Sequence, residues 1–127
     1  MTTDPAGMEH LAQMVREALQ SSDLDAYREL LDPLVSWGPP DDDVSGCHNR
    51  EEVLEWYQLA RDSGVRADVV ETVVRGERIL VGLMVHQAGA GEDVDDSLRW
   101  QILSVAGGRV KDIRGFEDRD EAVRRLG

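Results

Sequence analysis

The chain has three histidines, and histidine is the side chain best suited to acid–base chemistry near neutral pH. His10 falls within a helical pattern and is expected to be exposed. His48 precedes another helical pattern, and it is either a hydrogen-bonding loop residue or a general base at the mouth of a pocket. His86 ends a strand pattern before a glycine-rich loop, and it is either an ordinary strand-end residue or a general base. Cys47 and His48 do not make a nucleophile–base pair, because adjacent residues of an extended segment point in opposite directions.

Acidic side chains on strand patterns are the second group of candidate bases. Glu71 and Asp112 lie in apolar runs, and Asp68 lies near the start of a strand. Each is expected at a solvent-facing or edge position, because acidic side chains are rarely fully buried. Two acidic clusters, residues 41–43 and 92–96, could attract a divalent cation, but neither has the spacing of a calcium-binding loop. We therefore predict solvated acidic loops, no metal site and no other cofactor.

Aromatic residues from separate elements indicate either a well-filled core or a pocket for a flat apolar ligand. Five of them come from four predicted elements: Trp37, Trp56, Tyr57, Trp100 and Phe116. In a pocket, a few polar side chains would orient the ligand. The predicted pocket residues are Trp37, Tyr57, Met84, Trp100, Gln101, Arg114 and Phe116. Gly82, which stands among leucines and valines, indicates either a bend in the sheet or room for a ligand.

Four runs rich in valine, isoleucine and leucine indicate the strands that would position these side chains. They span residues 66–75, 78–87, 97–106 and 109–116. Gly76-Glu77 and Gly107-Gly108 are signals for two-residue hairpins, and the longer link 88–96 joins the two hairpins. The sequence therefore predicts a strongly twisted antiparallel meander.

Apolar residues occupy both faces of these strands. Val69 and Val73 are expected to face one way, and Val70 and Val74 the other way. An antiparallel sheet with one wet face would alternate apolar and polar residues instead, so both faces are expected to be covered. Because the helices can cover only one face, we expect a second copy of the chain to pack on the other face. The protein is therefore expected to be a homodimer with the sheet at its interface.

Helical patterns precede and follow the strands. Helices are predicted over residues 8–20, 24–31 and 49–63 and over the last nine residues, with a short strand over 34–38. Asp23, Asn49 and Asp118 are the expected N-caps, and residues 1–7 are expected to fray. The predicted fold class is α+β: a cone-shaped antiparallel sheet, three N-terminal helices in its concave face, and a short C-terminal helix.

Length and charge narrow the class of protein. At 127 residues the chain is expected to form a single domain over residues 1–127. A net charge of −12 argues against nucleic acid and anionic membranes as partners, because phosphate contacts need a basic surface. Cys47 is the one cysteine, which excludes an internal disulfide. With no signal-peptide pattern and no apolar run long enough to span a membrane, we expect a cytoplasmic protein.

Several stretches carry a likeness to known proteins through their order and spacing. They are residues 22–31 (SDLDAYRELL), 35–39 (VSWGP), 46–53 (GCHNREEV), 77–85 (ERILVGLMV) and 108–127 (GRVKDIRGFEDRDEAVRRLG). Together they resemble the SnoaL-like branch of the nuclear transport factor 2-like superfamily. The resemblance implies a cone-shaped α+β fold, usually a dimer packed through the sheet, with an apolar pocket. The superfamily includes polyketide cyclases, ketosteroid isomerases, limonene epoxide hydrolases and binding modules, so fold alone does not choose the function.

The chain departs from the enzymes of this superfamily at three positions. Trp37 stands where isomerase relatives carry an aspartate, Gln101 where many SnoaL-like relatives carry a histidine, and Gly115 where many carry an acidic or polar residue. A glutamine cannot act as a base. The expected function is therefore the binding of a small apolar organic molecule. The alternatives are an isomerase, polyketide cyclase or hydratase that uses a pocket histidine or acid as general base, and a non-enzymatic dimeric interaction module with a filled pocket.

Overall fold

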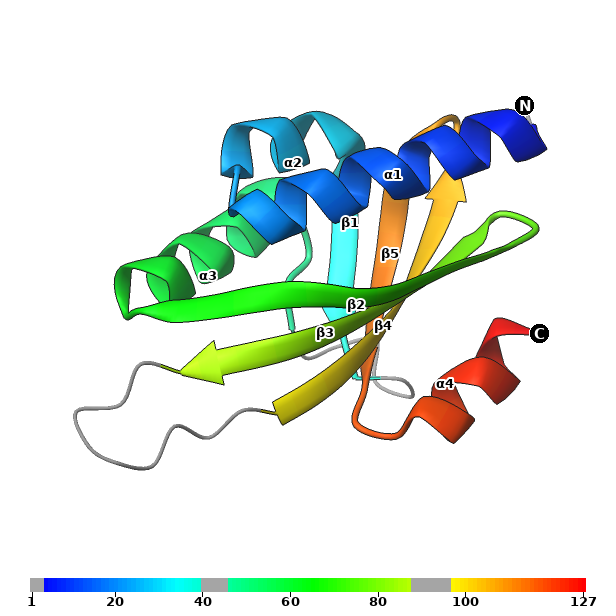
Figure 1. Ribbon diagram of the computed structural model, residues 1–127. Helices are drawn as coiled ribbons and strands as arrows, with labels where there is room; N and C mark the ends of the chain where they lie inside the picture. Colours follow the sequence, from blue (N-terminus) through cyan, green and yellow to red (C-terminus); the bar gives the residue numbers. More distant parts are fainter. Residues whose placement is uncertain (1–3, 40–45, 88–96) are drawn as a thin grey trace.

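A curved, open sheet of five strands forms the centre of the molecule (Figure 1). The computed structural model describes residues 4–39, 46–87 and 97–127. The strands are β1 (Leu31–Gly38), β2 (Val65–Arg75), β3 (Arg78–Gln87), β4 (Ser97–Ala106) and β5 (Arg109–Phe116), in the sheet order β1-β5-β4-β3-β2. The four long strands match the predicted runs to within one residue and pair antiparallel. The hairpin glycines Gly76, Gly107 and Gly108 have the positive φ that these tight turns need.

The first strand corrects the expectation of an all-antiparallel sheet. β1 pairs parallel to β5, and it begins at Leu31 rather than at residue 34. The two strands are far apart in the sequence, so no hairpin forces them to run in opposite directions. Pro33 lies within β1, where the register between the strands is interrupted, as expected for a residue without a backbone N–H.

The helices are α1 (Pro5–Ser21), α2 (Leu24–Leu30), α3 (Arg50–Asp62) and α4 (Arg119–Leu126). The predicted caps of α2, α3 and α4 are confirmed, since Asp23, Asn49 and Asp118 each accept a backbone N–H of the first turn. α1 begins three residues earlier than expected. Asp4 accepts the N–H of Gly7 at 2.6 Å, and Pro5 suits the first helical position. Residues 5–7 are therefore helical, and residues 1–3 lie outside the described part of the chain.

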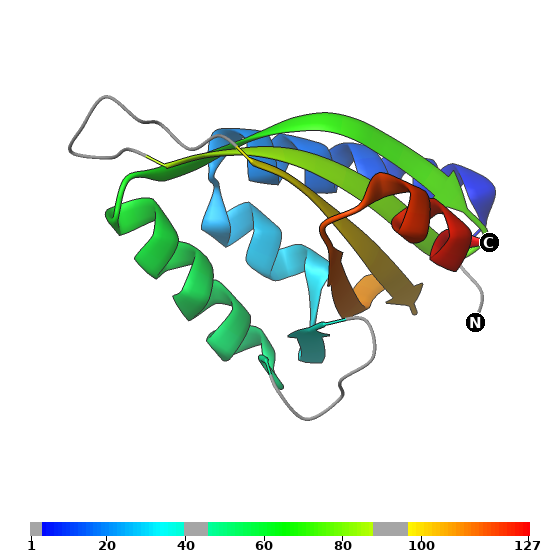
Figure 2. The same cartoon turned by 90° about the horizontal axis from the view of Figure 1, so that it is seen from below.

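The helices form two unequal layers on the sheet. α1, α2 and α3 pack on one face, which we call the inner face, and α4 packs across β3, β4 and β5 on the outer face (Figures 1 and 2). The three N-terminal helices thus lie where the sequence predicted. The outer face is partly covered by the chain itself, which corrects the expectation that helices cover one face only. Its apolar cluster, here called the outer cluster, is Leu80, Trp100, Ile102, Phe116, Ala122 and Leu126.

A bulge in β2 changes which valines face inward. Val69 pairs with Leu83, but the next paired residue is Glu71, opposite Gly82, so Val70 is the extra residue. Beyond the bulge the alternation is shifted by one position. Val69 and Val74 consequently pack with the inner core, while Val73 packs against the outer cluster. The predicted pairing of Val69 with Val73 on one face is therefore wrong.

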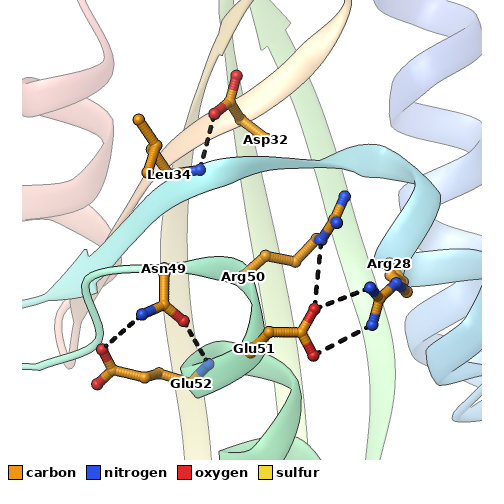
Figure 3. A network of polar contacts seen from close by, with 7 residues as sticks. All are labelled: Arg28, Asp32, Leu34, Asn49, Arg50, Glu51 and Glu52. Carbon is orange, nitrogen blue, oxygen red and sulfur yellow. Dashed lines mark hydrogen bonds and ion pairs between the residues drawn. The ribbon is translucent and has the colours of Figure 1, made fainter.

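Polar contacts fix the start of α3 against α2 (Figure 3). Arg28 of α2 donates to Glu51 of α3 at 2.9 Å. Asn49 Oδ1 accepts the backbone N–H of Glu52 at 2.9 Å, and Asn49 Nδ2 donates to Glu52 Oε1 at 3.0 Å. These contacts set the direction in which α3 leaves the strand region, and α3 carries two of the aromatic residues described below. Among the described residues, no helix combines the length and the apolar character needed to cross a membrane.

Candidate functional site

A cavity of about 790 Å³ lies between the inner face of the sheet, the end of α1 and one side of α3. Its wall includes Leu19 of α1, Tyr57 of α3, Ala67 of β2, and Leu83 and Val85 of β3. Inward side chains recur at every second position of a strand, which is why Leu83 and Val85 both border it. The volume falls within the range of roughly 300–1,000 Å³ that is common for small-molecule sites.

Three aromatic rings form one wall of this cavity. Trp37 of β1 stacks on Tyr57, with ring centroids 5.0 Å apart and an angle of 15° between the planes. Trp56 meets Trp37 edge-on at 4.9 Å, and it remains 55% exposed. Tyr27 also belongs to this aromatic group, because its ring contacts the ring of Tyr57 edge-on, with centroids 5.4 Å apart. Flat aromatic surfaces of this kind offer a large apolar contact area to a flat ligand.

Gln101 is the one buried amide side chain in the described part of the chain, at 6% exposure. It lines the cavity, and its Nε2 donates to Tyr57 Oη over 3.4 Å. Its Oε1 finds no hydrogen-bond partner among the described residues, and the same holds for Tyr27 Oη. Burial raises the pKa of Tyr27 well above its ordinary value and also raises the pKa of Tyr57. Both hydroxyls are therefore neutral at physiological pH.

Charged side chains border the cavity only where it opens. They are Arg61, Arg66, Arg99, Glu117, Asp118 and Glu121, and none of these six is buried. Arg99 donates to Glu117 at 3.2 Å, and Asp118 caps α4. Because the charges stay at the rim, the described interior of the cavity is neutral.

Five of the seven predicted pocket residues border the cavity: Trp37, Tyr57, Trp100, Gln101 and Phe116. Trp100 and Phe116 also belong to the outer cluster, and Asp118 and Glu121 at the start of α4 border the cavity as well, so the cavity extends toward the outer face. The Trp100 ring covers Gly82, where an added Cβ would lie 2.3 Å from Cζ3 of the indole. The Trp100 ring thus fills the space that Gly82 leaves, so this space is not room for a ligand.

Met84 and Arg114 are not among the residues that border the cavity. Met84 alternates with Leu83 and Val85 and so points to the outer face, opposite Asp68 and Leu98. Arg114 lies opposite Ile102 of the outer cluster, and its side chain contacts Asp112 and the carbonyl of Pro39, each at 3.0 Å. The sequence alone did not show which set of alternate side chains on each strand faces inward, because that depends on the register of the strands.

The two candidate histidines lie outside the cavity wall as well. His48 is exposed, while the neighbouring Cys47 pairs with Trp37 along the edge of β1. Burial, and to a smaller extent Glu52, raises the pKa of the Cys47 thiol. His86 lies on the outer side, with Nε2 2.9 Å from Asp68 Oδ2. General-base roles for His48 and His86 stay predictions, and these positions give them no geometric support.

The remaining acidic candidates take part in structural contacts. Glu71 receives two bonds from Arg119, at 2.9 Å and 3.0 Å. Asp112 accepts from Ser36 Oγ at 2.6 Å. Hydrogen bonds from Gln20, and then from His86, lower the pKa of Asp68. In the described ranges, no three His, Cys, Asp or Glu side chains gather as a metal site would require. The acidic clusters 41–43 and 92–96 lie outside those ranges.

Sequence reasoning missed the rim of the site and much of its apolar wall. Arg61, Arg66 and Arg99 come from three different elements, and only the folded chain brings them to one opening. Leu83 and Val85 carried a usable signal, because they share parity with Val81 and Ile79, both of which belong to the inner core. Knowing that one of these residues faced inward would have placed the others.

No protein-family model matches this chain, and no curated protein sequence does. Solved structures do match it over most of its length. A candidate ketosteroid isomerase from Kribbella flavida DSM 17836 is similar with a TM-score of 0.75 and 17% identity, over 92% of this chain and 82% of that chain. An NTF2-like protein of unknown function from Burkholderia pseudomallei K96243 is similar with a TM-score of 0.70 and 20% identity, over 94% and 97%. This chain has the nuclear transport factor 2-like (NTF2-like) fold.

A third similar structure is that of a candidate SnoaL-like polyketide cyclase from Jannaschia sp. CCS1. It has a TM-score of 0.71 and 14% identity, over 99% of this chain and 96% of that chain. Two of the three similar structures carry functional descriptions, and the two descriptions differ; the Burkholderia pseudomallei protein has no known function. At these identities the likeness establishes the NTF2-like fold, and the function must be argued from the site itself.

Proposed function

We propose that this NTF2-like protein binds a neutral, largely apolar organic molecule in the cavity on the inner face. The observation that carries the proposal is the make-up of the interior, where an aromatic wall and apolar side chains surround one buried amide, Gln101. Small-molecule sites typically combine a large apolar surface with a few polar groups that fix the orientation of the ligand.

The neutrality of the ligand follows from the placement of charges. Burying an ion without a partner costs far more than burying a neutral polar group. The charged side chains that border the cavity, such as Arg61 and Glu121, stay at least partly exposed at the rim. A ligand that enters the interior therefore leaves any charge of its own near the opening.

Binding is favoured here over acid–base catalysis. A general base must lie within hydrogen-bond reach of the proton that it removes. No histidine and no buried carboxylate borders the cavity in the described part of the chain. The volume of about 790 Å³ also argues against the third alternative, a pocket filled by the protein's own side chains.

We also propose a homodimer through the part of the outer face that α4 leaves uncovered. Val70 and Leu98 are exposed there, and Leu98 pairs with the partly buried Met84. Exposed apolar side chains that lie together on a sheet favour an interface. Sedimentation at micromolar concentration is expected to give a dimer, and Leu98→Glu is expected to give a monomer. A monomeric wild-type protein would contradict the dimer and leave the binding proposal standing.

The binding proposal is tested by titrating the 15N-labelled protein with naphthalene, a flat neutral probe. All three tryptophans of the chain border the cavity, so their indole N–H signals report on its occupancy. We expect saturable shifts of the Trp37 and Trp56 signals. Ala67→Phe, which fills the cavity from β2, is expected to abolish them. Ala106→Phe, at an exposed end of β4, serves as the matched control and is expected to retain them.

Two results would contradict the proposal. One is the absence of any saturable shift in the wild-type protein. The other is unchanged binding in Ala67→Phe, because a probe that tolerates a filled cavity must bind elsewhere.

A further inference from the structure

We infer that the natural ligand presents a hydroxyl or N–H donor at its inner end, and that the side-chain oxygen of Gln101 accepts it. The inference rests on the proposed function and names the class of molecule that the cavity selects. It concerns alcohols, phenols and amides with an apolar body, as opposed to ketones, ethers and carboxylates.

The hydrogen bonds of Gln101 are incomplete. A glutamine amide offers two N–H donors and an oxygen with two acceptor sites. Among the described residues, its side chain makes one hydrogen bond, from Nε2 to Tyr57 Oη at 3.4 Å, and Oε1 makes none. That contact is longer than the usual range of about 2.7–3.2 Å for an N–H···O bond, so it is weak. A buried amide with so few bonds is costly, and a ligand that completes them recovers that cost.

The polar atom of Gln101 that makes no hydrogen bond is its acceptor, Oε1. Oε1 can only accept, so a ketone or an ether brings nothing to it. Tyr57 Oη already receives the Nε2 proton, and burial keeps both Tyr57 and Tyr27 protonated by raising their pKa. A carboxylate would bring a second set of acceptors and an unpaired charge into a neutral interior. A neutral O–H or N–H group satisfies the oxygen without either penalty.

A rotation of the Gln101 amide would bring Oε1 into contact with a ligand in the cavity. Oε1 is closed off from solvent in this arrangement, so the amide must turn about its last torsion to meet a donor in the cavity. That torsion has a broad energy profile in glutamine. The turn breaks the long contact from Nε2 to Tyr57 Oη, and the protonated Tyr57 hydroxyl can donate to Oε1 in its place, so the movement costs little. The oxygen keeps its second acceptor site for the ligand.

The test compares three probes of nearly equal shape by calorimetric titration: naphthalene, 2-naphthol and 2-methoxynaphthalene. In the wild-type protein, 2-naphthol is expected to bind about tenfold more tightly than 2-methoxynaphthalene, the ratio that corresponds to one good hydrogen bond. Gln101→Leu is expected to bring the two affinities together by weakening 2-naphthol alone. Gln13→Leu, at an exposed position of α1, is the control and is expected to keep the wild-type ratio.

The wild-type ratio decides the inference even if the Gln101 variant does not fold. Equal affinities for 2-naphthol and 2-methoxynaphthalene overturn the donor inference, while the binding of both still supports the proposed function. Tighter binding of 2-methoxynaphthalene also overturns it, because the Gln101 N–H would then face the ligand. A failure of all three probes to bind overturns the proposed function itself.

Discussion

Trp100 and Gln101 are neighbours on β4, and their side chains lie on opposite faces of the sheet. Trp100 lies in the outer cluster, and its ring covers Gly82 so closely that a single added carbon would clash. Gln101 lies at the wall of a cavity of about 790 Å³, and its side-chain oxygen has no hydrogen-bond partner among the described residues. One face is filled without a gap at this point, and the other face is hollow.

The difference indicates a division of tasks between the two faces. A filled apolar cluster gains stability from close contacts, and it loses stability when any atom is added or removed. A hollow with an incompletely bonded amide does not add to stability, but it can recognise a ligand.

The largest effect is expected for truncation of a leucine in the filled face. Leu80 is fully buried in the outer cluster, whereas Leu83 borders the cavity. Leu80→Ala is expected to lower the free energy of unfolding by about 2–5 kcal/mol, and Leu83→Ala by clearly less, because less close packing surrounds the removed atoms. Urea denaturation of both variants measures the difference. An equal or larger loss for Leu83→Ala would show that the inner face is packed as tightly as the outer one.

The second comparison adds a methyl group to each face. At Gly82 the new Cβ would meet the Trp100 ring at 2.3 Å, and at Gly115, which borders the cavity, it would meet nothing within 4 Å. Gly82→Ala is expected to cost about 1–3 kcal/mol of unfolding free energy, from overpacking. Gly115→Ala is expected to stay within about 0.5 kcal/mol of the wild-type protein. Similar urea midpoints for the two variants would contradict the packing of Trp100 on Gly82.

Much of this arrangement is predictable from the sequence, since the strand boundaries and three helix caps depend on nearby residues. Hairpin glycines, β-branched runs and cap residues determine the backbone conformation of a few neighbouring residues. They were therefore sufficient to predict strands β2 to β5 and the starts of three helices. The parallel pairing of β1 with β5 and the packing of α4 on the outer face depend on contacts between segments that are distant in the sequence, so local patterns did not predict them. The bulge at Val70 shows the limit most clearly, because one extra residue reverses the facing of every side chain that follows it.

The sequence likewise predicted part of the candidate site, because five of the seven predicted pocket residues border the cavity. The aromatic residues and Gln101 could be singled out by type, because few residues combine apolar surface with a polar group. Met84 could not be placed, since period-two alternation gives two sets of residues without saying which is inward. The incomplete hydrogen bonding of Gln101 is a property of the folded packing, and no sequence pattern encodes it.

The third prediction concerns a gain in stability. Gln101→Leu removes a buried amide that makes one weak hydrogen bond, so the free energy of unfolding is expected to rise by about 1 kcal/mol. The same change is expected to erase the preference for 2-naphthol, which would separate stability from recognition at one position. Gln13→Leu is expected to leave both properties unchanged. A loss of stability in Gln101→Leu would mean that the amide is well bonded in solution.

The smallest effect is expected at the ion pair that joins α4 to the filled face. Arg119 donates two bonds to Glu71 and lies 5.7 Å from the centroid of the Trp100 ring. The hydrogen bonds from Arg119 lower the pKa of Glu71 below its ordinary value of 4.5. A carboxylate with a lowered pKa stabilises the folded state above its unfolded-state pKa, and this contribution disappears as the pH falls through the folded-state pKa.

Glu71→Gln tests this contribution against the wild-type protein. The variant is expected to unfold at a slightly lower urea concentration than the wild-type protein at neutral pH, and the difference is expected to vanish once the pH falls below the lowered pKa of folded Glu71, where this carboxyl is protonated in both states. The difference is expected to be small because the side chains of Arg119 and Glu71 are 48% and 31% exposed, and water screens such pairs. Arg109→Gln, at an exposed position of β5 far from this pair in the sequence, serves as the control for a lost surface charge. A difference that persists unchanged in acid would show that the packing around Trp100, and not the ion pair, holds α4 on the sheet.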